Sequence, residues 1–267
     1  MWEQVLMYVQ MWFGSFTFEL GRYVVGAGGV FLLINLLLKK PLAGRKIRKK
    51  HARPRQMFRE IRASMMSVSV YALVGLVTYL AIRAGILDTR SDPSEFGWLY
   101  FGFSVVAMIV AQDAYFYWTH RFLHLPKIMP YSHHYHHKSI NPTPFTSYSF
   151  DPIEAAIHAI FVTIYITIVP TSHLAVYIFM AHQVLRNALA HSGYEVYPRS
   201  WAKHPIMGWL NLVTHHDMHH SYGQANYGLW FTWWDRWMGT EHPNYLAKAS
   251  GDPSARRPNA PTAQAAE

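Results

Sequence analysis

The sequence contains no cysteine and few charged residues. Without cysteine, the 267-residue chain has no disulfide, no thiolate metal ligand and no cysteine nucleophile. Only 15% of the residues are charged, against about 25% in ordinary soluble domains. Hydrophobic residues make up 51% of the chain. This composition predicts a single membrane-embedded unit rather than one or two soluble domains.

Long apolar segments predict an all-α integral membrane protein with about four to five membrane helices. A spanning helix needs about 20 apolar residues. The candidate segments are 22–38, 64–82, 97–118, 153–170 and 173–190. The last two are separated only by "PTS" and predict a helical hairpin that either crosses the membrane or only enters it. Residues 1–20 lack the basic start of a cleaved signal peptide, so we expect a retained anchor there.

Basic residues are concentrated in one tract and predict the topology. Residues 39–62 hold eleven of the 24 lysines and arginines. Such a tract can bind nucleic acid, but between two apolar segments it predicts a cytoplasmic loop that faces anionic lipid. The loop 83–97, which includes Arg90 and Asp92, then lies outside. Residues 119–152 and those after 191 return to the cytoplasm, where we expect a helical, histidine-rich cap.

The chain divides by composition into three parts. Residues 1–96 contain the N-terminal membrane helices and the basic loop, 97–245 the histidine-rich part, and 246–267 a small, polar, Pro-rich tail that we expect to be disordered. The stretch "DPIEA" predicts a helix start, with Asp151 as N-cap, Pro152 at the first helical position and Glu154 completing a capping box. Both acids therefore have a structural explanation.

Eleven of the 17 histidines lie in four short motifs: "HRFLH", "HHYHH", "NALAH" and "HHDMHH". Spacings of three and four residues place side chains on one face of a helix. The predicted metal ligands at these spacings are His120, His124, His133, His136, His137, His191, His216, His219 and His220. A single ion takes up to about six ligands, so nine imidazoles predict two metal ions. Imidazole suits iron, zinc, copper and nickel alike.

Other histidines and three acids have less specific interpretations. His134 and His215 adjoin the motifs, and we expect them behind the ligands or facing the substrate. Asp113, Asp217 and Asp235 are candidates to compensate the charge of the metals, with a polar helix contact equally open for Asp113. His51, His204 and His242 are expected to be structural or at the surface. For His158, His173 and His182, packing and function remain equally open.

The motifs, together with "NPTPFTSYSFDPIEA" and "NYGLWFTWWDRWMGTEHP", resemble the integral-membrane fatty acid hydroxylase and sterol desaturase superfamily over residues 95–245. The resemblance implies a four-helix membrane anchor and a cytosolic di-iron site. It implies oxygen-dependent hydroxylation or desaturation of a lipid, with 97–245 as the catalytic domain. Asn187 stands where some relatives have a histidine, and the resemblance implies that it holds a metal-bound water.

The chemistry of C–H oxidation adds further expectations. Zinc is redox-inert, so the reaction requires a metal such as iron together with dioxygen. Two electrons must come from outside, and the sequence has no dinucleotide fingerprint or haem-domain motif. We therefore expect a separate ferredoxin or cytochrome b-type donor with its reductase. The tryptophans 230, 233, 234 and 237 are typical of a membrane interface, or line a lipid route.

Two functions of other classes are weighed against the oxygenase. A metal or haem transporter places ionisable groups near the bilayer midplane, whereas these motifs fall just outside the apolar segments. A metal-dependent hydrolase needs a carboxylate general base in a motif such as HExxH, which the sequence lacks. Hydroxylation and desaturation, and the identity of the lipid, remain open. The site is expected at the cytoplasmic face of the inner membrane in a bacterium, or of the endoplasmic reticulum in a eukaryote.

Overall fold

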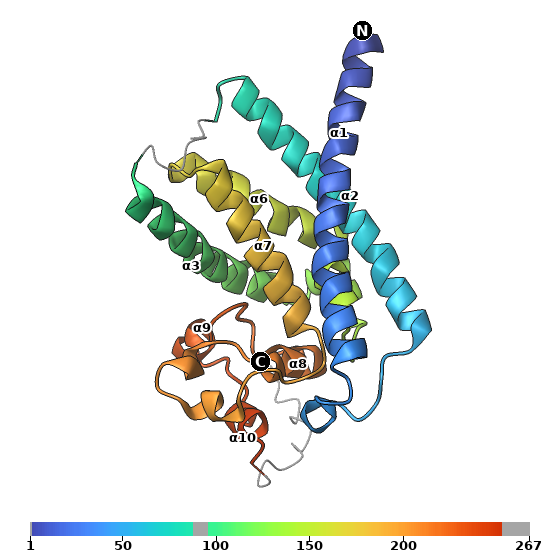
Figure 1. Cartoon of the computed structure of the whole chain (residues 1–267), viewed down its shortest axis with the longest axis vertical. Helices are drawn as coiled ribbons and strands as arrows, with labels where there is room; N and C mark the ends of the chain where they lie inside the picture. The colour runs from blue at the N-terminus through green and yellow to red at the C-terminus, as the bar shows by residue number, and fades with distance from the viewer. Residues whose placement is uncertain (1, 88–95, 253–267) are drawn as a thin grey trace.

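The computed structural model describes residues 2–87 and 96–252, most of which are in helices (Figure 1). Within these ranges the extended pairings are two isolated bridges, Lys46–Tyr194 and Leu210–Phe231. Long apolar helices form one part of the molecule, and the short helices α8, α9 and α10 lie together beyond one end of them. The predicted all-α membrane fold is confirmed.

The N-terminal helix is longer than expected. α1 (Trp2–Tyr23) continues through two π-helical segments, η1 (Val24–Gly28) and η2 (Phe31–Leu37), to give one apolar helix of 36 residues. The separate anchor 1–20 and span 22–38 are therefore a single element. Glu19 and Arg22 interrupt the apolar pattern, but their side chains bond to each other across one turn, and the helix continues past them.

Two further helices are long and apolar enough to cross a membrane, α2 (Pro54–Arg83) and α3 (Trp98–Leu123). The hairpin expected at 153–190 is present as α6 (Pro152–Ile168) and α7 (His173–Ala190). With 17 and 18 residues, these helices rise about 26 Å, less than the roughly 30 Å of a hydrocarbon core. Ser172 caps α7 by accepting a hydrogen bond from the backbone of Ala175 at 3.2 Å.

Short elements make up the remainder of the fold. They are η3 (Ala43–Arg45), α4 (Met129–Ser132), α5 (His134–His137), η4 (Pro144–Tyr148), η5 (Arg199–Lys203), η6 (Met207–Trp209), α8 (Val213–Tyr222), α9 (Trp233–Trp237) and α10 (Tyr245–Ser250). α10 corrects the expectation of a tail that is disordered from residue 246. Tyr245 and Ala249 are buried against Leu212 and Met218, and this apolar contact holds the helix. Residues 88–95, in the loop expected outside, and residues 253–267 of the tail lie outside the described residues.

The start of α6 differs in one detail from the prediction. The helix begins at Pro152 as expected, but no capping box forms. Asp151 Oδ2 instead accepts a hydrogen bond from the backbone N–H of Tyr135 at 3.0 Å. Oε1 of Glu154 lies 2.7 Å from Nδ1 of His133. Both carboxyl groups thus contact the "HHYHH" segment.

Candidate metal centre

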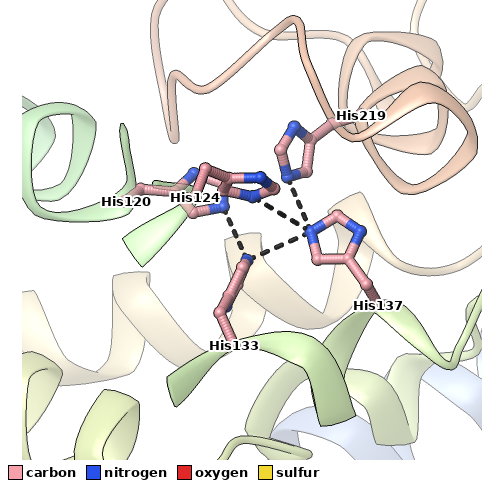
Figure 2. Close-up of side chains that lie close together, drawn as sticks. All are labelled: His120, His124, His133, His137 and His219. Carbon is pink, nitrogen blue, oxygen red and sulfur yellow. Dashed lines mark hydrogen bonds between the residues drawn. The ribbon is translucent and has the colours of Figure 1, made fainter. Parts of the chain in front are cut away.

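The nine histidines predicted as metal ligands lie together in two groups. Within each group the ligand nitrogens are all within 4.8 Å of one another. Group 1, drawn in Figure 2, consists of His120, His124, His133, His137 and His219. Group 2 consists of His136, His191, His216 and His220. Each group therefore offers enough nitrogens for one metal ion.

Both "HHYHH" and "HHDMHH" contribute to both groups. In the first motif, His133 and His137 belong to group 1 and His136 to group 2. In α8, the i, i+4 pair His216 and His220 belongs to group 2, whereas His219 faces group 1. Each motif thus links the two groups, and a shift of either segment disturbs both.

Backbone carbonyls fix the orientation of several rings. Nδ1 of His120 lies 2.9 Å from the carbonyl of Tyr227, and Nδ1 of His219 lies 2.8 Å from that of Ala225. A carbonyl only accepts, so Nδ1 carries the hydrogen and Nε2 keeps its lone pair towards the centre. The other contacts of this kind join His136 to Ser149 at 3.3 Å and His191 to Asn187 at 2.7 Å.

The facing nitrogens have the chemistry of a cation site. Nε2 of His120 lies 3.0 Å from Nε2 of His133, and the corresponding distance between His191 and His216 is 2.9 Å. Two ligands at right angles on a metal with bonds of about 2.0–2.1 Å lie about 3 Å apart. Burial, followed by nearby imidazoles, holds the pKa of His133 and His216 well below its usual value, which favours the neutral imidazoles that bind metals. Facing lone pairs at this distance fit a divalent metal.

Glu154 is a site residue that the sequence interpretation missed. Its Oε1 lies 2.7 Å from Nδ1 of His133 and 3.4 Å from Nε2 of His158, and its side chain is only 1% exposed. A carboxylate behind a ligand histidine fixes the ring and increases its basicity. One signal in the sequence could have identified it: Glu154 is an acid at the start of the apolar helix that follows the "HHYHH" segment. The capping explanation made a role beside the histidines look unnecessary.

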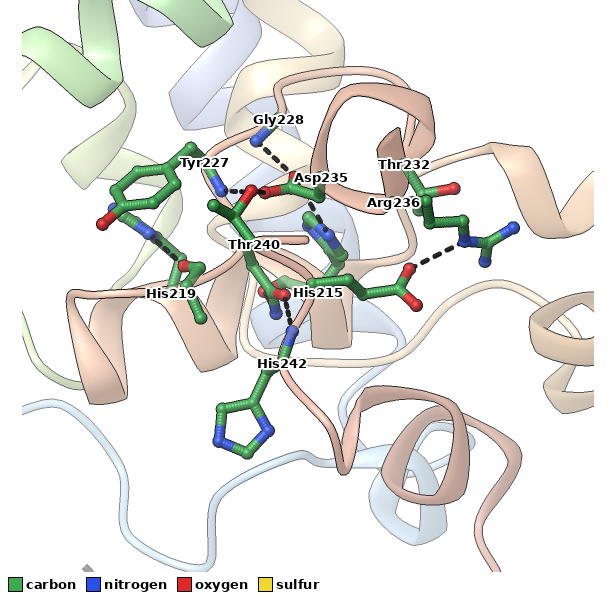
Figure 3. A network of polar contacts seen from close by, with 12 residues as sticks. His215, His219, Tyr227, Gly228, Thr232, Asp235, Arg236, Thr240 and His242 are labelled. Atoms are coloured by element: carbon green, nitrogen blue, oxygen red, sulfur yellow. Dashed lines mark hydrogen bonds and ion pairs between the residues drawn. The ribbon is translucent and has the colours of Figure 1, made fainter. Parts of the chain in front are cut away.

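The loop that follows α8 is tied down by Asp235 (Figure 3). This buried carboxylate accepts hydrogen bonds from the backbone of Tyr227 at 2.8 Å and of Gly228 at 2.7 Å, and from the hydroxyl of Thr240 at 2.7 Å. Its Oδ2 also lies 3.5 Å from Nε2 of His215. Because the carbonyl of Tyr227 binds the outer nitrogen of a group 1 histidine, Asp235 supports group 1 through this loop.

Asn226 sits at the centre of the same loop. Its φ of 60° is the left-handed conformation, which asparagine tolerates better than most residues. The side-chain amide donates to the carbonyl of His215 at 3.0 Å, and its oxygen accepts from the backbone of His242 at 2.7 Å. Asn226 thereby places the carbonyls on either side of it, those of Ala225 and Tyr227, against two ligand histidines.

We expect Asn226→Ala to destabilise the protein and weaken metal binding more than Asn226→Gly does. Both variants lose the two buried hydrogen bonds, at roughly 1–3 kcal/mol for each group left unpaired. Alanine adds about 1–2 kcal/mol for the left-handed backbone, which glycine adopts freely. Thermal unfolding and metal content of the two purified variants test this order. Equal effects would show that the backbone conformation does not matter here.

The three predicted acids have different surroundings. Asp113 accepts hydrogen bonds from the backbone of Trp230 at 2.7 Å and from the indole of Trp233 at 2.6 Å, and it contacts no ligand histidine among the described residues. It is therefore the polar contact rather than the histidine partner. Asp217 forms an ion pair with Arg48 at 2.7 Å. Of the three, Asp235 is the one beside a histidine, His215.

The remaining predicted residues lie outside the two groups. His134 is exposed, and His215 is buried between Asp235 and Tyr245. The side-chain amide of Asn187 donates to the carbonyl of Ser147 at 2.8 Å, which anchors the end of α7. Among the tryptophans, Trp230 is buried, positions 233 and 234 are partly buried, and 237 is 60% exposed.

Comparison with known proteins agrees with the arrangement of the histidines. The family model for fatty acid hydroxylases matches residues 105–240, just over half of the chain. The chain belongs to the fatty acid hydroxylase family. All nine grouped histidines fall within the matched region of this family.

Several relatives in the family are named for reactions on sterols. The chain is 30% identical to the Delta(7)-sterol 5(6)-desaturase ERG3B of Gibberella zeae over 186 residues, which is 69% of this chain and 56% of the relative. It is 29% identical to the Delta(7)-sterol 5(6)-desaturase erg3C of Aspergillus fumigatus over 208 residues, 70% of this chain and 63% of the relative. It is also 30% identical to the lathosterol oxidase of Mus musculus over 195 residues, 71% and 62% of the two chains. The matches thus span less than two thirds of these relatives, and no solved structure matches the chain.

Proposed function

We propose that this protein is a membrane-bound di-iron oxygenase that uses dioxygen and two external electrons to hydroxylate or desaturate a C–H bond of a lipid. The observation that carries the proposal is the convergence of nine imidazoles into groups of five and four. The family membership and the three long apolar helices support it. Two irons bound there would supply the redox chemistry that zinc lacks.

The chain's own residues have defined tasks in this proposal. The Nε2 atoms of the two groups hold the metals, and the carbonyls behind them fix the tautomers. Glu154 places a carboxyl group directly behind His133, which fixes the orientation of this ring. Asp235 supports group 1 indirectly, by anchoring the loop whose Tyr227 carbonyl binds His120. Asn187 is proposed to hold a metal-bound water next to His191.

The names of the relatives suggest the substrate class to test first. Several of them are Delta(7)-sterol 5(6)-desaturases, and others are lathosterol oxidases. A Δ7-sterol is therefore the first candidate, ahead of fatty acyl and other lipids. Desaturation and hydroxylation start from the same hydrogen removal, so one assay that detects both products covers both reactions.

The basic tract supports a position at the cytoplasmic face and a separate electron donor. Arg48 joins this tract to α8 through its ion pair with Asp217, and the backbone of Ile47 bonds to that of Gly193 at 3.0 Å. The tract therefore lies against the metal-binding layer. Its exposed members are Lys39, Lys40, Lys49, Lys50, Arg53, Arg55 and Arg62. These charges suit anionic lipid headgroups and an acidic ferredoxin or cytochrome b-type donor.

The proposal is tested by metal content and turnover of the detergent-purified protein. We expect about two irons per chain by elemental mass spectrometry, since each group fills one coordination shell. With lathosterol, a ferredoxin or cytochrome donor and its reductase, we expect an oxygen-dependent product by mass spectrometry. Two zinc ions that persist after iron supplementation, or a single haem, would contradict the oxygenase and favour hydrolysis or transport.

A further inference from the structure

A large cavity lies between the apolar helices, and none of the nine grouped histidines lines it. It has a volume of about 670 Å³ and is lined by residues of α1, α2, α6 and α7. These four helices form one side of the bundle (Figure 1). Most of its lining is apolar, including Phe18, Val74, Val162 and Met180. A space of this size and polarity is suited to a lipid rather than to a polar metabolite.

One end of the cavity is adjacent to the metal centre. His158 lines this end, and its ring stacks on Phe116, with ring centroids 5.1 Å apart. Phe116 in turn packs on the group 1 ligand His120 at 4.7 Å. On its other side, His158 meets Glu154, which contacts His133. A single layer of side chains therefore separates this end from group 1.

A buried ion pair lies at the same end. Arg22 and Glu19 line the cavity and bind each other, with side chains 11% and 8% exposed. Arg22 lies over the ring of Tyr148, 5.9 Å from its centroid, and Tyr148 directly precedes Ser149, whose carbonyl binds a group 2 histidine. Arg22 is thus connected to group 2 through Tyr148 and Ser149.

Arg22 has hydrogen-bond donors to spare. One of its nitrogens bonds to Glu19, while Nε and Nη1 are buried without a hydrogen-bond partner among the described residues. Buried donors that lack a partner are costly, and a ligand that supplies an acceptor removes this cost. Because Glu19 already neutralises Arg22, a neutral hydroxyl suits the site better than a carboxylate, which would leave a net buried charge.

The opposite end of the cavity is well separated from this ion pair. Met11 lies eleven residues before Arg22 on α1, about 16 Å along the helix, and Ile166 lies eight residues after His158 on α6, about 12 Å. Apolar side chains predominate in this part, with Thr171 and His173 at its rim. The cavity is therefore polar near the metals and mainly apolar towards its far end.

We propose that this cavity is the lipid site and that Arg22, held by Glu19, binds the hydroxyl of a neutral, sterol-like lipid at the end nearest the metals. The apolar body of the lipid then extends towards Met11 and Ile166. This orientation rests on the proposed function and adds to it which carbon of the lipid is oxidised. The oxidised carbon lies a few bonds from the hydroxyl, and the length of the far tail does not change it.

Lipid binding tests the site without requiring turnover. The probes are tritiated lathosterol, its 3-deoxy analogue and palmitic acid, each added to the purified, iron-loaded protein in detergent. We expect lathosterol to bind roughly tenfold or more tightly than the 3-deoxy analogue, since one charge-assisted hydrogen bond separates them. Arg22→Met should reduce lathosterol binding to the level of the analogue. Because that variant leaves Glu19 unpaired, the double variant Glu19→Gln/Arg22→Met is made as well, and it should show the same loss.

A matched pair of variants tests the cavity itself. Val162 lines the cavity, while Ile164 on the same helix is 42% exposed and does not line it. Val162→Phe should block both sterols, and Ile164→Phe should leave their binding unchanged. Equal binding of the two sterols, unchanged binding in both Arg22 variants, or tighter binding of palmitic acid than of lathosterol would overturn the assignment.

The same material separates failure of this inference from failure of the proposed function. If lathosterol binds through Arg22 but no oxygen-dependent product forms in the iron-loaded protein, the lipid site stands and the reaction is wrong. If lathosterol is oxidised equally by wild type and the double variant, the reaction stands and the orientation is wrong. Sterols with shortened side chains should be oxidised at the same ring position, and a shifted position would also refute the orientation.

Discussion

Replacing His219 by alanine removes both metal binding at group 1 and lipid oxidation. Its Nε2 lies 3.1 Å from that of His137, and its outer nitrogen is already committed to the carbonyl of Ala225. Alanine leaves a buried gap that no neighbouring side chain fills with a nitrogen. We expect the iron content to fall to about one per chain or less, and turnover to fall below detection. Elemental mass spectrometry and product analysis of the purified variant measure the two effects.

Two further variants make the result specific. His136→Ala removes a ligand of group 2 and should abolish turnover in the same way. His204→Ala is the control, because His204 is exposed and its ring only accepts hydrogen bonds from the backbone of Ile206 and Met207. Full metal retention in His219→Ala and His136→Ala, with activity lost, would refute the assignment of these two histidines as ligands.

Glu154→Gln should weaken metal binding by roughly 10–100-fold without unfolding the protein, the usual cost of removing a carboxylate behind a ligand histidine. Glutamine has nearly the same shape, so the packing of α6 is preserved. What is lost is the carboxyl group whose Oε1 lies 2.7 Å from Nδ1 of His133. Glu154→Ala should have a larger effect, because it also leaves a cavity beside two histidines. Titration of the apo-protein with Fe²⁺ under anaerobic conditions measures the affinity.

Glu60→Gln is the matched control for this prediction. Glu60 is also a fully buried glutamate, but it accepts hydrogen bonds from Gln56 at 2.7 Å and Thr143 at 2.5 Å, and it contacts no ligand histidine among the described residues. Its substitution should alter stability and leave the metal affinity unchanged. An equal loss of affinity in both variants would mean that general destabilisation, and not the contact with His133, explains the effect.

Much of the site was predictable because local spacing determines which side chains share a helix face. The i, i+3 and i+4 spacing in "HHYHH" and "HHDMHH" identified all of the grouped residues of these motifs. Spacing could not divide them between the groups, since His216 and His219 lie on one face of α8 and yet belong to different groups. That division depends on which neighbouring segment faces each imidazole.

The contacts behind the ligands were less predictable. For Asp113, the sequence left a histidine partner and a polar helix contact equally open, and the segment after α8 supplies its donors from Trp230 and Trp233. Glu154 looked like a capping residue, yet its carboxylate faces His133. In both cases a segment distant in sequence provided the partner.

The sequence by itself determined the all-helical membrane architecture, the nine histidines and the family, because apolar length and short-range spacing are local properties of the chain. Only the tertiary structure decided the five-and-four division, the role of Glu154 and the cavity that ends at Arg22. These features arise where α1, α2, α6 and α7 meet and where segments far apart in sequence converge. Their energies depend on burial and on partners that no local pattern records.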